Sequence, residues 1–326
     1  MGGKIVTAPF MRMSDTRRNF LQSSAALAAG LAGAKSIDAQ ATGQGAAPPL
    51  KPASELQVPK MKFFNVEISR MVLGVNPFYG FAHYNNNFAS AMKEWYTQDR
   101  VCEIMHQCAR FGINAFNYVN LDRGPRDWAR FQAEGGNMHI IMQVVAGDDT
   151  AALVKTLKPL AMQRQGEVVD KAFQNDDMNS VKEWCKRVRD MGVLVGVGTH
   201  KPEVIAKVEE EGWDVDFYSG CVYNRTRTVE EWKKVLSGEM MEMAGDIYLQ
   251  SDPPRMYKVM RQTRKPCFAF KILAAGRIPD RGIEHAFRTA FESIKPTDGV
   301  YVGMFPRAKD EVRENVEIVR RILARG

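Results

Sequence analysis

Short apolar runs alternate with longer amphipathic segments along the chain after residue 57. The runs are four to eight residues long and almost wholly apolar, which is typical of parallel strands buried on both faces. Eight of them are predicted to be strands: 71–75, 113–118, 139–145, 166–169, 193–198, 215–219, 267–273 and 299–303. The fourth is the weakest, because Asp170 and Lys171 interrupt it.

Amphipathic segments with a helical period separate these runs, and the first three of them end close to a glycine. The predicted helices are 99–111, 180–191, 202–211, 254–263, 283–293 and 310–324. Strands alternating with helices predict a (β/α)8 TIM barrel, the closed form of repeated βα units. An open doubly wound sheet is the alternative, but no GxGxxG motif follows the first strand, as a dinucleotide-binding version of that sheet requires.

The first part of the chain has a different pattern. Arg17 and Arg18, followed by a polar residue and two apolar ones, match a twin-arginine export signal. A weakly apolar run over 25–34 follows, too short to span a bilayer, and Ala39-Gln40-Ala41 supplies a small-x-small cleavage site. An amphipathic N-terminal helix and a retained signal anchor are the alternatives.

Three regions follow from this pattern: a signal peptide over 1–41, a flexible linker over 42–57 and a single barrel domain over 58–326. The linker is rich in Gly, Ala and Pro and has no apolar period, so we expect it to bury nothing. The predicted protein is bacterial and periplasmic or secreted. Its expected partners are the twin-arginine export machinery and a small-molecule substrate, with no stable membrane span after processing.

Charge and cysteine content narrow the classes further. The formal net charge is +7, and the five Lys/Arg and two Asp/Glu before Thr42 leave about +4 for the rest. The remaining charges are interspersed, which is not a nucleic-acid footprint. The five cysteines form neither a disulfide framework nor a CxxC metal motif, and Cys102, Cys108 and Cys185 fall on predicted helices as small buried residues. A protein that folds in the reducing cytoplasm before export has no need of disulfides.

Several pieces of the chain together resemble the aldo/keto reductase superfamily. They are 69–74 at the first strand, 112–116 at the second, 196–198, 216–224, 302–303 and Glu314-Asn315. The resemblance implies a TIM barrel, with an Asp, Tyr, Lys and His set that protonates a substrate carbonyl. The corresponding positions depart from that set, because they hold Asn117, Asp122, Gln143 and the pair Asp170-Lys171. Amides cannot shuttle protons, so the family's proton relay is not expected to operate.

The resemblance also implies an NADP phosphate site made of basic residues and a helix N-terminus after the last strand. Arg307 and Lys309 lie in suitable places to hold an anion there, although two solvated charges before a helix are an equal alternative. The cofactor is therefore left unknown, with NADP possible but not favoured.

TIM barrels carry their chemistry at the C-terminal ends of the strands, and this rule selects candidate residues without an alignment. The loop after the first strand mixes aromatic and amide groups, including Asn76 and Tyr79, which suit a polyhydroxylated ligand. His83 in this loop is a candidate general acid or base. An ordinary capping loop is the alternative.

Later strand ends add further candidates. His200 follows the fifth strand and is predicted to be catalytic or metal-binding, and Arg225 after the sixth could clamp an anion. Lys271 in the seventh strand could stabilise an oxyanion or form a Schiff base if it faces inward, or snorkel if it faces outward. The other predicted substrate-binding residues are Asn117, Tyr118, Gln143, Tyr223 and Asn224.

A metal site would need His83 and His200 with Asp122 or Asp170, but no ligand-spacing motif supports it, and none is predicted. The leading functional hypothesis is an exported enzyme that uses acid/base chemistry without hydride transfer, of the lyase, isomerase or hydrolase type, on a small sugar or hydroxy-carbonyl compound. An NADP-dependent oxidoreductase with altered catalytic residues and a non-catalytic carbohydrate-binding barrel are the alternatives.

Overall fold

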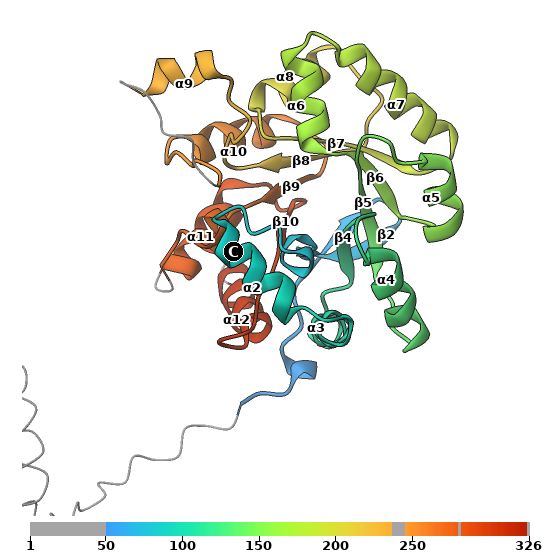
Figure 1. The fold of residues 1–326 in the computed structure, drawn as a ribbon, viewed down its shortest axis with the longest axis vertical. Coiled ribbons are helices and arrows are strands. Elements are labelled where there is room, and N and C mark those ends of the chain that lie inside the picture. The colour runs from blue at the N-terminus through green and yellow to red at the C-terminus, as the bar shows by residue number, and fades with distance from the viewer. Residues whose placement is uncertain (1–49, 237–244, 280–281, 325–326) are drawn as a thin grey trace, which may run out of the picture. The chain divides into compact units, whose positions relative to one another are not determined.

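Eight parallel strands close into a barrel with helices on its outside (Figure 1). The computed structural model describes residues 50–236, 245–279 and 282–324. The strands pair in the order β10-β3-β4-β5-β6-β7-β8-β9 around the barrel. Their bounds are β3 Met71–Gly74, β4 Ala115–Val119, β5 His139–Val144, β6 Ala161–Arg164, β7 Leu194–Thr199, β8 Phe217–Cys221, β9 Cys267–Phe270 and β10 Gly299–Val302. The predicted (β/α)8 TIM barrel is confirmed.

The helices pack their apolar stripes on this barrel. They are α2 Asn86–Trp95, α3 Gln98–Arg110, α4 Gly124–Ala133, α5 Thr150–Leu157, α6 Gly166–Gln174, α7 Met178–Asp190, α8 Pro202–Glu210, α9 Val229–Val235, α10 Asp252–Gln262, α11 Ile283–Ser293 and α12 Glu311–Leu323, with short 3-10 turns at η1 Ala53–Glu55, η2 Asn76–Tyr79 and η3 Ala274–Gly276. The six predicted helices correspond to α3, α7, α8, α10, α11 and α12 to within two residues at each end. No helix in the described parts of the chain has the length and apolar character of a membrane span.

The predicted fourth strand is wrong. Residues 166–169 begin helix α6, and the strand is the preceding segment, β6. Gln165 caps the helix, since its side chain accepts a hydrogen bond from Val168 N. The apolar pair that suggests a strand is Val168-Val169. Val169 is fully buried in the core, where it packs as part of helix α6. Asp170 and Lys171 consequently lie on a helix.

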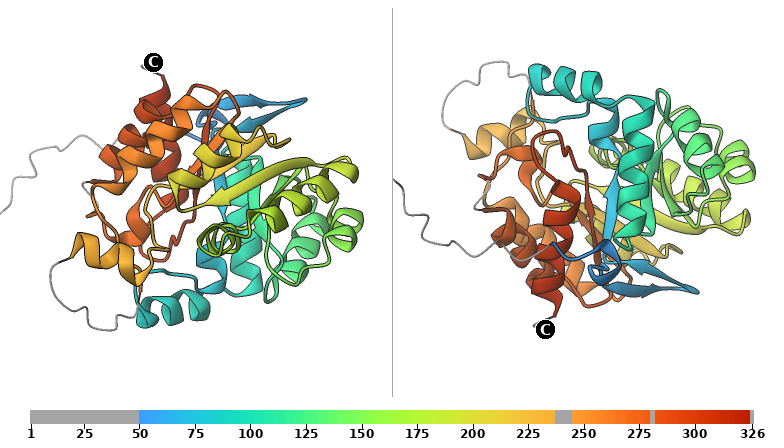
Figure 2. Two further views of the ribbon diagram at one scale, coloured as in Figure 1. Left: turned by 90° about the horizontal axis from the view of Figure 1, so that it is seen from above. Right: turned by 90° about the horizontal axis from the view of Figure 1, so that it is seen from below.

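An N-terminal hairpin closes one end of the barrel. Strands β1 (Lys60–Phe63) and β2 (Val66–Ser69) pair antiparallel, and Phe63 contacts the rings of Phe217 and Phe268 at centroid distances of 5.6 and 5.5 Å. Gly196 leaves room for this cluster, because a Cβ there would lie 2.3 Å from the Phe217 ring. Both views in Figure 2 show the hairpin (blue) at the end opposite α2 (teal) and α9 (gold).

Alternation along the strands builds a second interior layer at the other end, the mouth. The inward positions below it are apolar, such as Ala115, Ile141 and Ala161. Two residues further along the same strands, the inward-facing side chains are polar. The polar members of this mouth layer are Asn117, Gln143, Gln163, Ser219 and Tyr301.

The end of the predicted linker belongs to the barrel unit, which begins at Lys51. Leu56 is buried, and Gln57 Nε2 donates hydrogen bonds to the carbonyls of Ala53 and Arg110, both at 2.8 Å. The prediction that this stretch buries nothing is therefore wrong for its last residues. The predicted signal peptide and the linker up to residue 49 lie outside the described residues. All five cysteines are buried and unpaired.

Candidate functional site

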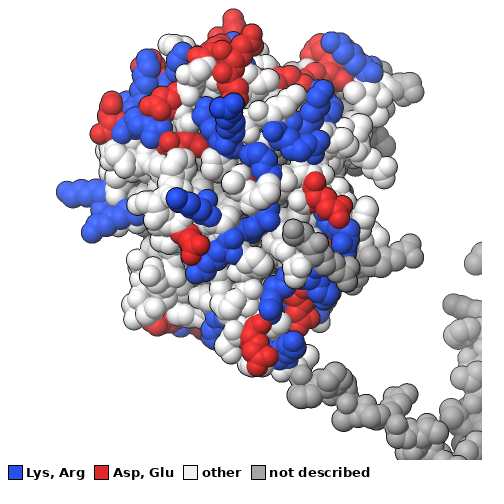
Figure 3. All heavy atoms as spheres, turned by 180° about the vertical axis from the view of Figure 1, so that it is seen from behind, with Lys and Arg blue, Asp and Glu red and all other residues white. Residues whose placement is uncertain are grey.

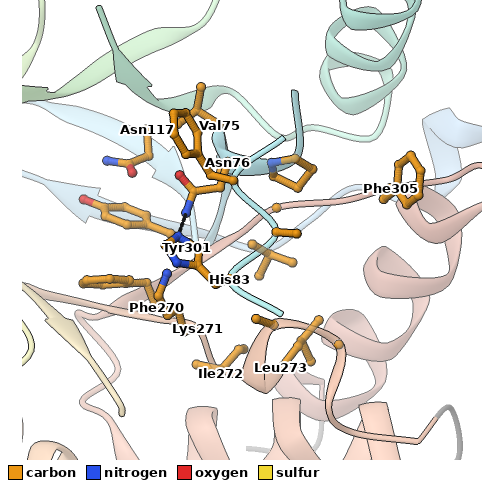
Figure 4. A pocket seen from close by; sticks show the side chains of 18 of the residues that line it. Val75, Asn76, His83, Asn117, Phe270, Lys271, Ile272, Leu273, Tyr301 and Phe305 are labelled. Atoms are coloured by element: carbon orange, nitrogen blue, oxygen red, sulfur yellow. Dashed lines mark hydrogen bonds between the residues drawn. The ribbon is translucent and has the colours of Figure 1, made fainter. Parts of the chain in front are cut away.

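A pocket of about 280 Å³ opens at the mouth, between the loops that follow β3, β9 and β10. Figure 4 shows Asn117 and Tyr301 at its barrel end and Phe305 at its outer end, with His83 and Lys271 between them. Asn76, Gln143 and Gln163 also line it. The structure thus brings together His83, Lys271, Asn76, Asn117 and Gln143 among the residues predicted from sequence.

His83 is held on both ring nitrogens. Its Nδ1 lies 3.1 Å from the Asp246 carboxylate, and its Nε2 lies 3.2 Å from Asn76 Nδ2. A neutral imidazole satisfies both contacts when Nδ1–H donates to Asp246 and Nε2 accepts from the amide of Asn76. Burial, helped by the charges of Lys271 and Arg225 and opposed by Asp246, lowers the pKa of His83 to about 4. The ring is therefore a neutral, oriented proton acceptor at pH 7.

Asp246 joins three loops at this point. Besides His83, its carboxylate accepts hydrogen bonds from Arg225 Nε at 2.7 Å and Tyr248 OH at 3.2 Å. Burial acts to raise the pKa of Asp246, but the hydrogen bonds from His83 and Arg225 outweigh it and the pKa is lowered. The predicted anion clamp, Arg225, is thus engaged by the protein's own carboxylates, since it also pairs with Glu167.

Arg277 links the loops that carry His83 and Asp246. Its guanidinium lies between the rings of Tyr84 and Tyr248, 5.0 and 4.4 Å from their centroids. It donates hydrogen bonds to the backbone carbonyls of His83 at 2.9 Å and Asp246 at 2.6 Å. A planar guanidinium suits this combined stacking and forked donation.

Lys271 lies just beyond strand β9 and not within it, because the strand ends at Phe270. The residue has a left-handed backbone (φ 60°), and its side chain lines the pocket. Burial, with Arg225 and Arg277 nearby, lowers the pKa of Lys271 to about 8, against the opposing charge of Asp246. The amine can therefore exchange protons near neutral pH.

The barrel end of the pocket is lined by neutral hydrogen-bonding groups. Gln143 Nε2 donates to Asn117 Oδ1 at 2.7 Å, and Asn117 Nδ2 donates to the Ile141 carbonyl at 3.3 Å. Ser219 Oγ donates to Gln163 Oε1 and lies 3.0 Å from Tyr301 OH. Burial raises the pKa of Tyr301 strongly, so its hydroxyl stays protonated. Where the resemblance leads us to expect a histidine at the end of the fourth strand, β6 presents Gln163.

His200 is not among the residues that line this pocket. It is 3% exposed, and its Nδ1 lies 2.6 Å from Asp170 Oδ2. Asp170 also accepts hydrogen bonds from the hydroxyls of Thr199 at 2.5 Å and Thr226 at 2.9 Å. These contacts join β7, α6 and the loop after β8, so the geometry is that of a buried structural network.

The predicted tyrosines take packing positions outside the pocket lining. Tyr79 OH donates to Asp127 Oδ2 at 3.1 Å in a buried network, and Tyr118 is fully buried against Phe116 and Trp128. Alternation explains Tyr118, because its neighbour Asn117 faces the barrel interior. Tyr223 stacks on Tyr248 with centroids 4.5 Å apart.

Asn224 is also enclosed by the protein. It is buried, its Oδ1 accepts from Thr226 N at 3.3 Å, and its backbone N–H donates to Asp252 Oδ2 at 3.2 Å. These contacts hold the loop after β8 against α10, and Asn224 does not line the pocket.

The predicted cofactor residues do not form an anion cradle. Arg307 is exposed, and Lys309 Nζ pairs with Glu314 at 3.0 Å. Glu311 accepts a hydrogen bond from Phe305 N at 2.7 Å, and Glu311 and Glu314 themselves line the pocket. Two carboxylates lie on the side of the pocket where the resemblance implies phosphate binding.

Charges elsewhere are mixed. Figure 3 shows Lys and Arg interspersed with Asp and Glu over one face of the molecule. Within 50–236, 245–279 and 282–324, no three His, Cys, Asp or Glu side chains are grouped as metal ligands would be. The two histidines of the considered metal set bind different aspartates, Asp246 and Asp170.

No family model and no curated protein matches the chain. Among solved structures, it is similar to an aldo/keto reductase from Brucella melitensis, with 10% identity, 82% of this chain and 93% of that chain covered, and a TM-score of 0.49. A glycerol dehydrogenase from Gluconobacter oxydans gives 13% identity, 81% and 96% coverage, and a TM-score of 0.44. A truncated 3-deoxy-D-arabino-heptulosonate 7-phosphate synthase from Thermotoga maritima gives 12% identity, 82% of this chain and 92% of that chain covered, and a TM-score of 0.47. These likenesses concern the barrel fold alone.

Sequence reasoning missed Asp246, Gln163, Tyr301 and Arg277. Asp246 and Arg277 lie in long loops without a period, Gln163 lies in the strand that was misplaced, and Tyr301 is hidden within an apolar run. Counting inward positions along β10 would have placed Tyr301 in the mouth layer.

Proposed function

We propose that this barrel is an exported acid/base enzyme that acts on a small hydroxy-carbonyl compound without hydride transfer, as a lyase or isomerase does. The observation that carries the proposal is the shared pocket of His83, oriented by Asp246, and Lys271. A neutral base and an ammonium group facing one pocket are what enolisation of a carbonyl compound requires.

The proposed step begins with the substrate replacing the amide of Asn76 at His83 Nε2. His83 then removes a proton from the carbon next to the carbonyl, and the electrons of the C–H bond form an enolate. The Lys271 ammonium stabilises the negative oxygen. For isomerisation, the enolate oxygen takes a proton from Lys271 to give an enediol, the hydroxyl on the neighbouring carbon returns its proton to Lys271, and protonated His83 delivers its proton to the former carbonyl carbon. For elimination, the β-hydroxyl leaves with the proton held by His83, as water, and the carbonyl forms again. Asn117, Gln143 and Gln163 orient hydroxyl groups and take no proton.

A reductase reaction fits this pocket poorly. NADP carries phosphates, and the wall that would receive them presents Glu311 and Glu314. Like charges at close range repel. In addition, the backbone N–H of Phe305, which could otherwise bind a phosphate, already donates to the carboxylate of Glu311. Hydride transfer from this cofactor is therefore not part of the proposed reaction.

Deuterium exchange tests the proposal without knowledge of the final product. The full chain is incubated with hydroxyacetone in D2O, and loss of the proton signal next to the carbonyl is followed by NMR. We expect exchange above the buffer rate, a loss of about 100-fold or more in His83→Ala, and little change in the control His106→Ala, whose side chain pairs with Glu134 on the outer helices.

Equal exchange in the parent and His83→Ala, or none above buffer in the parent, would contradict the proposal. Quenching of NADPH fluorescence at submillimolar concentration would favour the oxidoreductase alternative. Ligand binding with no turnover, unchanged in His83→Ala, would favour a non-catalytic carbohydrate-binding barrel.

A further inference from the structure

The two ends of the pocket differ in chemistry. The barrel end presents the amides of Asn117, Gln143 and Gln163 and the hydroxyl of Tyr301. Beyond His83 and Lys271 the wall becomes mainly aliphatic and aromatic. The residues that form this outer wall are Phe88, Met92, Ile272, Leu273, Ile278 and Phe305.

The outer wall is preformed by packing. Phe305 meets the rings of Phe88 and Trp95 edge to face, at centroid distances of 5.6 and 5.4 Å. Ile272 is 4% exposed, and Met92 is buried. Four separate segments, α2 and the stretches after β9, η3 and β10, therefore contribute apolar surface to one side of the cavity without any need for rearrangement.

The charged groups of the outer wall are carboxylates that already have protein partners. Glu311 accepts from Phe305 N, and Glu314 pairs with Lys309. Their negative charge disfavours a phosphate or carboxylate on the part of a ligand that lies there. A sugar would place hydroxyl groups against Phe88 and Phe305, where the apolar side chains offer no hydrogen bonds.

We infer that the substrate is amphipathic, with a hydroxy-carbonyl head between His83 and Lys271 and an uncharged apolar tail against Phe88, Leu273 and Phe305. The position of the head rests on the proposed function. The tail rests on the composition of the outer wall, which holds whether or not the head reacts. A pocket with a polar barrel end and an apolar outer wall thus favours 1-hydroxy-2-ketones with an alkyl chain over sugars and sugar phosphates.

Binding of a homologous series tests the inference directly. Isothermal titration of the full chain with hydroxyacetone, 1-hydroxy-2-butanone and 1-hydroxy-2-hexanone should show affinity rising about threefold to fourfold per added methylene. Over three methylenes the gain is roughly 30- to 60-fold. Dihydroxyacetone phosphate and erythrulose, the charged and polyhydroxylated probes, should bind more weakly than 1-hydroxy-2-hexanone.

A variant of the wall supplies the matched comparison. In Leu273→Ser the increase in affinity per added methylene should fall toward onefold, while the affinity for hydroxyacetone stays within about twofold of the parent. Leu273→Met should keep the parent's increase per methylene. Phe88→Ala gives the same readout from the other side of the cavity if Leu273→Ser does not fold.

A flat affinity series, or tighter binding of erythrulose or of dihydroxyacetone phosphate, would overturn the inference. Because the titration reports affinity and the exchange experiment reports proton transfer, the two proposals fail separately. Chain-length dependence without deuterium exchange removes the proposed function alone, and exchange without chain-length dependence removes only the apolar tail.

Discussion

His83 and Lys271 approach the same pocket from two different loops, and both hold a left-handed backbone, with φ of 56° and 60°. Ala274 and Ala275 follow Lys271 in the same region, with φ of 49° and 51°. Each such residue costs an L-amino acid about 1–2 kcal/mol. Strain of this kind persists only where surrounding contacts hold it. In the described parts of the chain, four of the eight non-glycine residues with this backbone lie in the two loops that carry His83 and Lys271.

The pH dependence of the proposed reaction follows from the two shifted pKa values. His83 must be neutral to accept a proton, so activity should appear above its pKa of about 4. Lys271 must be charged to stabilise the enolate, so activity should decline above its pKa of about 8. A profile of kcat/KM against pH should therefore be bell-shaped with limbs near these values. A rate that rises through pH 8 would show that Lys271 acts as the neutral amine.

Replacing Lys271 by Met should stabilise the fold at neutral pH. The folded-state pKa of about 8 lies below the ordinary lysine pKa of 10.5. The unfolded chain therefore binds more protons between these two values, and the stability of the parent rises with pH across that window. Below pH 8 the variant should be more stable by up to roughly 3 kcal/mol, and the difference should vanish near pH 10.5. Urea unfolding of both proteins at pH 7 and pH 10 measures it, and a gain that does not change with pH would contradict the account.

The contrast between the two histidines gives a third prediction. His200→Ala removes a partner of the buried Asp170, so we expect a loss of about 2–4 kcal/mol in the free energy of unfolding. The rate per folded molecule should stay within a few-fold of the parent, because His200 does not line the pocket. His83→Ala should show the opposite pattern, with a large loss of rate and a small loss of stability. A rate loss in His200→Ala equal to that in His83→Ala would contradict this account and support the catalytic role of His200 that the sequence predicts.

Arg277 should act as a positioning residue, since it donates to the carbonyls of both His83 and Asp246. In Arg277→Ala the two loops lose this link, and we expect kcat to fall by roughly 10- to 100-fold. The lower limb of the pH profile should also move up from about 4 toward 6.5, as water reaches His83. Arg277→Lys should recover part of both effects. A lower melting temperature with an unmoved limb would indicate a purely structural role.

The fold could be predicted from the sequence because parallel strands buried on both faces leave an unmistakable apolar run. The exception is instructive. Strand β6 spans Ala161–Arg164, and its last two residues, Gln163 and Arg164, are polar, so no apolar run reveals this strand. The first turn of α6 meanwhile supplied a false run at Val168-Val169.

The site could be predicted only where strand ends dictate it. Asn117 and Gln143 follow from the positions that the family resemblance points to, and His83 and Lys271 from their places at or after strand ends. Asp246 could not be found, because the loop that carries it has no period and reaches His83 across 163 positions of sequence. His200 shows the converse limit, since a strand-end histidine can turn its ring into the protein instead of the mouth.

The hairpin that closes the barrel also constrains how this protein can be made. Phe63 is synthesised early, yet its packing partner Phe268 and the pairing partner of β3, strand β10, come from the last quarter of the chain. Until residue 302 has left the ribosome, the edges of β3 and β9 stay unpaired and the Phe63 cluster stays incomplete. Closure is consequently a late event in biosynthesis, and a chain that stops short of β10 exposes the surfaces that chaperones and proteases recognise.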